Sequence, residues 1–117
     1  QHDQNTNLVI KCHELRRVPL KNLTVENLRL MIGPQIGLTY LVPVALDILQ
    51  IEPLAQGAMY PGDLLISVYR LPEQFWITNF RLKFKFKKIA EQAVGQIDAL
   101  GNDIPNALVK LKQELQR

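Results

Sequence analysis

Between residues 24 and 70, apolar side chains recur at helical spacing, and this stretch is the most apolar part of the chain. Thr24 stands at its start and carries the kind of hydroxyl that accepts an orphaned backbone N–H at a helix N-terminus. We therefore predict a helix directly after Thr24, which the turn-forming residues from Gly33 onward bring to an end. Its apolar face comprises Val25, Leu28, Met31 and Ile32.

A second apolar run extends over residues 38–51 and contains Pro43 near its start. Because proline is tolerated in the first turn of a helix but disrupts the interior, the run predicts a helix at about 42–52. This helix is apolar on nearly all sides, which is typical of the middle of a bundle. Polar residues interrupt the run before the ~20 apolar positions that a span requires, so we expect no membrane contact. A turn-rich connection then leads to a third helix, which begins at Asp63.

Residues 80–89 allow two interpretations. Apolar and basic residues alternate up to Phe86, which is typical of a β-strand. A longer stripe with steps of three and four residues is typical of a helix and comprises Leu82, Phe86, Ile89, Ala93 and Ile97. No second alternating segment exists in the sequence to pair with a strand and take its backbone hydrogen bonds. We therefore predict a helix from about 80 to 99, on which Phe84 and Phe86 largely face inward.

Three shorter patterns complete the set of predicted helices. Residues 7–17 carry a loose apolar stripe that predicts an N-terminal helix. Pro72 begins a further turn of helix, because its fixed backbone angle suits a first turn. Near the C-terminus, Asn102 or Asp103 is expected to cap a last helix that has Pro105 in its first turn. The inward-facing residues of that helix are Leu108, Leu111 and Leu115.

Together these patterns predict an all-α fold, namely a single-domain orthogonal bundle of about six to seven helices. At 117 residues the chain is long enough for one sizeable core, so we expect one domain over residues 1–117. The polar residues 1–6 are expected to be disordered.

The sequence contains no recognisable catalytic constellation. Its single cysteine, Cys12, excludes an intrachain disulfide and a cysteine zinc site, and it fits a reducing compartment. On a helix the adjacent His13 would point about 100° away from Cys12, so the two cannot act alone as nucleophile and base. Metal-ligand clusters, phosphate-binding loops and nucleophile motifs are also missing from the sequence. We therefore predict no catalytic residues, no metal and no cofactor.

Charge is unevenly distributed along a chain whose total is only +3. Residues 42–78 hold four carboxylates against Arg70, a balance of −3, whereas residues 79–90 hold five cations and no carboxylate. Basic residues interleaved with aromatic ones suit phosphates and stacked bases. A small helical nucleic-acid-binding domain that uses residues 81–88 is therefore one functional hypothesis.

The connection over residues 57–63 supports a second hypothesis, that of a protein-binding module. Rigid scaffolds often present binding residues on such connections, although many connections only join two helices. This one carries Met59 and Tyr60, which are residue types enriched at protein interfaces.

Several long phrases follow one another in the first two thirds of the chain. They are CHELR (12–16), PL (19–20), LTVENLRLMIG (23–33), QIGLTYLVPVALDIL (35–49) and YPGDLL (60–65). These phrases resemble those of small bacterial immunity proteins of contact-dependent growth inhibition systems, over about residues 8–76. The chain departs from the family's pattern at Asn27, where an acid is usual, and at Pro34 after the glycine.

The resemblance implies a cytoplasmic antidote that is not an enzyme. Such a protein would be made in the cell that also makes the toxin-delivering surface protein. It would bind the cognate C-terminal toxin domain, often a nuclease, after that domain arrives from a neighbouring cell.

A nuclease inhibitor profits from carboxylates, because nuclease sites are basic and opposite charges speed association. We therefore predict that the acidic middle of the chain contacts the toxin, with Tyr60 as the aromatic anchor. Asp63 has an alternative role as a helix cap, which would engage its carboxylate with backbone N–H groups. The predicted toxin-binding residues are Asp47, Glu52, Met59, Tyr60, Asp63 and Glu73.

Overall fold

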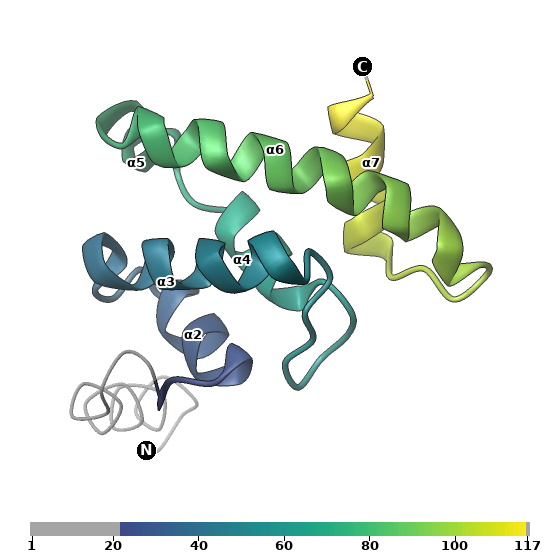
Figure 1. Ribbon diagram of the computed structural model, residues 1–117, viewed down its shortest axis with the longest axis horizontal. Helices are drawn as coiled ribbons and strands as arrows, with labels where there is room; N and C mark the ends of the chain where they lie inside the picture. The colour runs from purple at the N-terminus through teal and green to yellow at the C-terminus, as the bar shows by residue number, and fades with distance from the viewer. Residues whose placement is uncertain (1–21, 117) are drawn as a thin grey trace, which may run out of the picture.

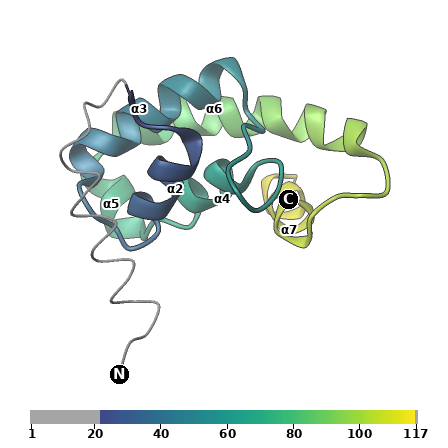
Figure 2. The ribbon, with the colours of Figure 1, turned by 90° about the horizontal axis from the view of Figure 1, so that it is seen from below.

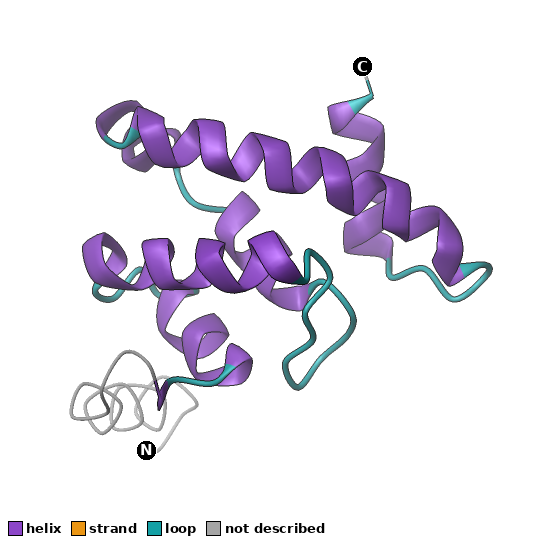
Figure 3. Cartoon of the chain, viewed as in Figure 1, coloured by secondary structure: helices purple, strands orange, loops and turns teal. Residues whose placement is uncertain are grey.

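The computed structural model describes residues 22–116, and all regular secondary structure in this part of the chain is helical (Figures 1 and 3). The helices are α2 (Val25–Ile32), α3 (Leu38–Ile51), α4 (Asp63–Tyr69), α5 (Glu73–Thr78), α6 (Phe80–Ile97) and α7 (Asn106–Leu115), with a 3₁₀ turn at Asp98–Leu100. The predicted all-α fold is confirmed, and the alternating segment 80–86 is part of a helix. The helix predicted at 7–17 lies outside the described residues.

Local side-chain chemistry sets the start of α2. The backbone N–H of Asn27 donates to the Thr24 hydroxyl at 3.1 Å, and the Asn27 side chain accepts from the Thr24 N–H at 3.1 Å. This reciprocal pair satisfies two backbone donors that would otherwise have no helical partner. The predicted cap at Thr24 is confirmed.

The second helix begins four residues earlier than its sequence predicts. Gly37 adopts a left-handed conformation, with φ at 64°, and its carbonyl accepts from the N–H groups of Tyr40 and Leu41 at 3.0 Å. Pro43 therefore lies inside α3 and not in its first turn. The hydrogen bond that proline cannot donate would have gone to the carbonyl of Thr39, an exposed residue that water can reach.

The helices cross one another around a shared core. α3 and α6 run alongside each other in Figure 1, whereas α7 crosses α6 and is seen nearly end-on in Figure 2. α3 contacts α2, α4 and α6, which places it centrally, as predicted. Its buried residues are Leu41, Val42, Ala45, Leu46 and Leu49.

α6 buries one face and exposes the other. The predicted inward stripe is confirmed at Phe86, Ile89, Ala93 and Ile97, which are buried together with Ala90. The predicted inward position of Phe84 is wrong, because Phe84 is 66% exposed. Residues two positions apart on a helix point about 200° away from each other, so Phe84 cannot share the buried face of Phe86.

The start of the last helix also differs from its prediction. α7 begins at Asn106, so Pro105 precedes the helix instead of standing in its first turn. No side chain caps this helix, which shows that the predicted cap at Asn102 or Asp103 is wrong. The inward positions of Leu108 and Leu111 are confirmed, since both are fully buried, and Leu115 is partly buried against the core.

Candidate functional site

A buried carboxylate holds the connection between α3 and α4, residues 52–62. Asp63 is the first residue of α4 and is only 2% exposed. Its carboxylate accepts hydrogen bonds from the backbone N–H groups of Gly57 at 2.7 Å, Met59 at 2.9 Å and Tyr60 at 3.5 Å. These donors belong to the preceding connection and not to α4. Asp63 therefore organises the connection, which Figure 1 shows as a long loop beside the helices.

A second carboxylate reaches the same connection from α2. Glu26 accepts a hydrogen bond from the backbone N–H of Ala58 at 2.9 Å. It also forms a two-pronged ion pair with Arg29, whose Nε and Nη2 lie 2.7 and 2.6 Å from its two oxygens. Arg29 Nε lies 3.7 Å from Asp63 Oδ2, so one guanidinium joins the two carboxylates. The four backbone N–H groups of residues 57–60 are thereby all engaged.

This arrangement shifts the protonation equilibria of both members of the ion pair. The hydrogen bonds that Arg29 donates lower the pKa of Glu26, with a further contribution from the Ala58 N–H, and partial burial opposes them. The same contact with Glu26 raises the pKa of Arg29. The ion pair is consequently charged on both sides at neutral pH.

The close approach of the connection to these carboxylates requires glycine at position 57. A Cβ atom on Gly57 would lie 2.5 Å from Glu26 Oε1 and 3.1 Å from Asp63 Oδ2. Neither oxygen can withdraw without losing a hydrogen bond to the connection. We name Glu26, Arg29 and Asp63 together the carboxylate clamp. The clamp presents Met59, which is exposed, and Tyr60, which is partly buried against the core.

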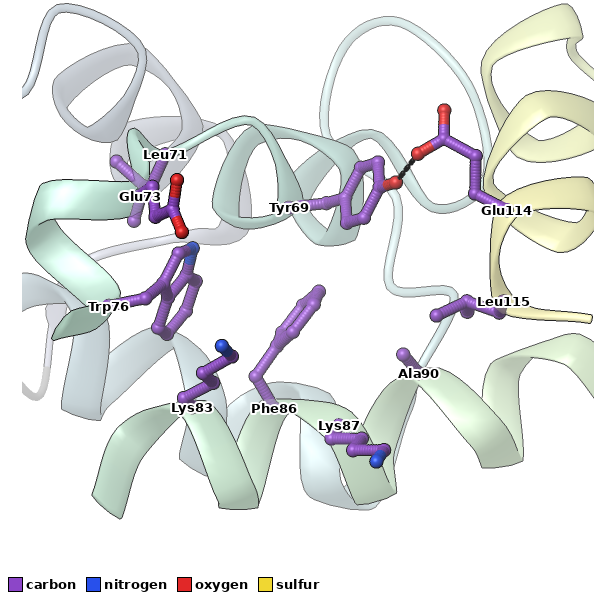
Figure 4. Close-up of a pocket in the computed structure, with 10 residues that line it drawn as sticks. All are labelled: Tyr69, Leu71, Glu73, Trp76, Lys83, Phe86, Lys87, Ala90, Glu114 and Leu115. Carbon is purple, nitrogen blue, oxygen red and sulfur yellow. Dashed lines mark hydrogen bonds between the residues drawn. The ribbon is translucent and has the colours of Figure 1, made fainter. Parts of the chain in front are cut away.

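A separate groove opens between α4, α5, α6 and α7 (Figure 4). Its volume is about 770 Å³, and aromatic side chains of Tyr69, Trp76 and Phe86 form much of its lining. Phe86 lies between the other two, with ring centroids 5.4 Å from Trp76 and 6.3 Å from Tyr69. Tyr69 also donates a hydrogen bond to Glu114 of α7. The groove is therefore a preformed feature built from four helices.

Two further features bear on the kind of site. Within residues 22–116, no three histidine, cysteine, aspartate or glutamate side chains are grouped so that they could hold a metal ion. None of the helices over the same residues combines the length and the apolar character needed to cross a membrane.

Comparison with known proteins identifies the family. The model of the CDI immunity proteins, those of contact-dependent growth inhibition systems, matches residues 1–86. The chain belongs to this family. The match confirms the resemblance seen in the sequence and extends it beyond residues 8–76 at both ends. No curated protein and no solved structure matches the chain.

Membership in the CDI immunity family makes the position of each predicted toxin-binding residue important. The structure brings Met59 and Tyr60 of the connection together with Asp63, the first residue of α4, whose carboxylate accepts their backbone N–H groups. Glu52 is exposed where α3 ends. Asp47 is exposed on α3 and forms an ion pair with Lys85 of α6 at 2.6 Å. The sixth residue, Glu73, is exposed and lines the aromatic groove, away from the connection.

The sequence interpretation missed two members of the clamp, Glu26 and Arg29. Their spacing of three residues on a helix is a signal for mutual pairing. Nothing in the local pattern indicates that Glu26 also reaches Ala58, which is 32 residues away in the chain. The groove was missed as well, because Tyr69, Trp76 and Phe86 belong to three different helices.

Proposed function

We propose that this chain neutralises the toxin domain of its own contact-dependent growth inhibition system by binding it directly in the cytoplasm. The family match over residues 1–86 is the observation that carries this proposal. The mode of action is occlusion of the toxin's active site or substrate surface, without any catalytic step by the immunity protein. The partner is a protein, and no cofactor or metal takes part.

The toxin is a nuclease in this proposal. Nuclease surfaces that hold phosphates are basic, so exposed carboxylates on an inhibitor attract them and raise the association rate. Glu52 and Glu73 are exposed, and among residues 22–116 neither side chain has an ion-pair partner. These two carboxylates are the members of the acidic middle that remain most available to a partner.

The connection over residues 52–62 supplies the central contact in the proposal. Met59 and Tyr60 provide apolar and aromatic area, with Glu52 close in sequence and Asp47 contributing charge from α3. Asp63 acts from beneath by holding the loop in place. A loop whose backbone donors are already engaged loses less conformational entropy on binding, and this preorganisation favours tight association.

The test is a binding and protection experiment with the cognate toxin domain. Glu52→Lys and Tyr60→Ala are expected to weaken binding, and Glu52→Lys should slow association most at low salt, where charge screening is weakest. Asp103→Lys is the matched control, since it changes the charge equally at an exposed position between α6 and α7. Cells that carry the chain should survive the toxin. A wild-type chain that neither binds the toxin nor protects cells would refute the proposed function.

A further inference from the structure

The outward face of α6 is unusual because it combines exposed aromatic and basic side chains. Phe80 and Phe84 are 60% and 66% exposed, and their spacing of four residues places them on one side of the helix. Lys83 and Lys87 follow them at spacings of three, so the two lysines form a ridge beside the two phenylalanines. Phe86 and Ala90 are buried and lie on the other side of the two lysines from the phenylalanines, so that side of the ridge borders the groove.

The lysine ridge separates two apolar features. On one side lie the exposed rings of Phe80 and Phe84. On the other lies the aromatic groove, where Figure 4 shows Lys83 and Lys87 along the α6 wall beside Phe86. An occupant of this surface therefore meets positive charge between two apolar strips.

Within the described residues, four of the five cations of α6 have no carboxylate partner. Among the ion pairs formed by residues 22–116, Lys85 is the single member of the basic segment 79–90, and it pairs with Asp47. No ion pair within residues 22–116 includes Arg81, Lys83, Lys87 or Lys88. Four unpaired cations on half a helix leave a positive field that an acidic partner would complement.

We infer that the lysine ridge, together with the Phe80 and Phe84 strip on one side and the aromatic groove on the other, forms a docking surface for an acidic polypeptide segment of the toxin domain. Carboxylates of that segment lie over Lys83 and Lys87, and an apolar side chain enters the groove beside Trp76. This inference rests on the proposed function, because it assigns the surface to the same partner. It adds a second contact, distinct from the connection that carries Tyr60.

The chemistry of the groove favours a polypeptide over nucleic acid or anionic lipid. Glu73 and Glu114 stand on the walls opposite the lysines, so an occupant that spans the groove meets both signs of charge, which a chain of phosphates does not complement. Phe86 is stacked with Trp76 and Tyr69, at interplanar angles of 28° and 23°, so its faces are not free for bases. A polypeptide can present both signs of charge as well as an apolar side chain.

The same charges disfavour a second copy of this chain as the occupant. Two α6 helices packed through their outer faces would bring several of their cations together. Glu91 is the one carboxylate that α6 has to offset them. Like charges in direct apposition oppose association.

The experiment compares three purified variants with the wild type in titrations of the cognate toxin domain at low and high salt. Lys83→Glu combined with Lys87→Glu should weaken binding roughly tenfold or more at low salt, and the difference should narrow at high salt. Phe84→Ser should weaken binding several-fold at both salt concentrations, because its contribution is apolar. Arg70→Glu combined with Lys110→Glu is the matched control, since it removes the same charge from exposed residues that do not line the groove.

Thermal melts accompany each titration, and all substituted positions are exposed, so little loss of stability is expected. The ridge variant is the one that combines Lys83→Glu with Lys87→Glu. Should the ridge variant lose its fold, Phe84→Ser supplies an independent test. If the ridge variant and Phe84→Ser both bind the toxin as tightly as the wild type does, the inference is overturned. Loss of binding only with Glu52→Lys or Tyr60→Ala also overturns it, while leaving the proposed function intact.

Two further titrations separate the other classes of partner. Wild type and the ridge variant are mixed with single-stranded oligothymidylate, and with phosphatidylserine-containing vesicles. The inference is overturned if the ridge variant loses binding to either probe but still binds the toxin as the wild type does. The lysine ridge would then be a phosphate-binding surface. A wild-type chain that fails to bind the toxin at all refutes the proposed function, and this inference with it.

Discussion

The connection over residues 52–62 and the outer face of α6 use charge in opposite ways. In the connection, carboxylates face inward: Asp63 and Glu26 hold four backbone N–H groups and share Arg29. On α6, Lys83 and Lys87 face outward and have no carboxylate partner among residues 22–116. Some carboxylates of the acidic middle are thus engaged in contacts within the protein, whereas most cations of the basic segment remain available to a partner.

This contrast shows why a local charge count is a poor guide to a binding surface. The count of −3 over residues 42–78 includes Asp63, which is buried, and Asp47, which pairs with Lys85. Among the ion pairs within residues 22–116, the basic segment contributes Lys85 alone. What a partner meets is the charge that remains after internal pairing, and tertiary structure decides that remainder.

The largest effect is expected from removing the buried carboxylate of the connection. Asp63→Ala should lower the free energy of unfolding by about 3 kcal/mol, because it leaves backbone donors of the connection without their acceptor and removes one of the two carboxylates beside Arg29. Glu52→Ala, at an exposed position nearby in sequence, is the control and should change stability by less than about 0.5 kcal/mol. Urea denaturation of both variants measures the difference. Equal stability of the two would show that the clamp does not hold the connection.

A smaller effect, with a characteristic pH dependence, is expected at Glu26. Its pKa is lowered in the folded state, so unfolding takes up a proton at acidic pH. The stability from this carboxylate is complete above the pKa that Glu26 has in the unfolded chain and is lost as pH falls through the lower folded pKa. Glu26→Gln should therefore cost about 1 kcal/mol at neutral pH and progressively less at acidic pH. Denaturation of both proteins at several pH values tests this, and a constant difference would contradict it.

The smallest effect is expected on α6, and it has the opposite sign. Lys83 and Lys87 are one helical turn apart, and like charges at this spacing destabilise a helix by about 0.2–0.5 kcal/mol. Lys87→Gln should therefore stabilise the isolated protein by a similar amount while weakening the toxin complex. Careful thermal melts at low and high salt measure the gain, which should shrink as salt increases. A clear loss of stability would show that Lys87 has an internal role after all.

The sequence carried most of the information about the helices. The Thr24 cap lies within three residues of its partner Asn27, and the stripe that ends in Ile97 repeats over a single helix. Such features are local, so the residues themselves define them whatever the rest of the chain does. The start of α3 was misplaced because Pro43 is a strong local signal, and the packing of α3 against three other helices outweighs the one hydrogen bond that proline removes.

The candidate surfaces depended on contacts that no local pattern contains. Helical periodicity alone places Phe86 on the apolar face of α6 and Phe84 off it, so the inward prediction for Phe84 followed the alternating pattern and not the helical one. What periodicity does not contain is the set of neighbours, and the structure shows that Tyr69 and Trp76 stack on Phe86.

The sequence by itself determined the helical class of the fold, the family and the loop that carries Tyr60. Tertiary structure alone decided which charges are free. Glu26 accepts a hydrogen bond from Ala58, which is 32 residues away in the chain, and Asp47 pairs with Lys85, which is 38 residues away. The energy of such pairs depends on the distance between atoms in space, and that distance is set by how the helices pack and not by their order in the chain.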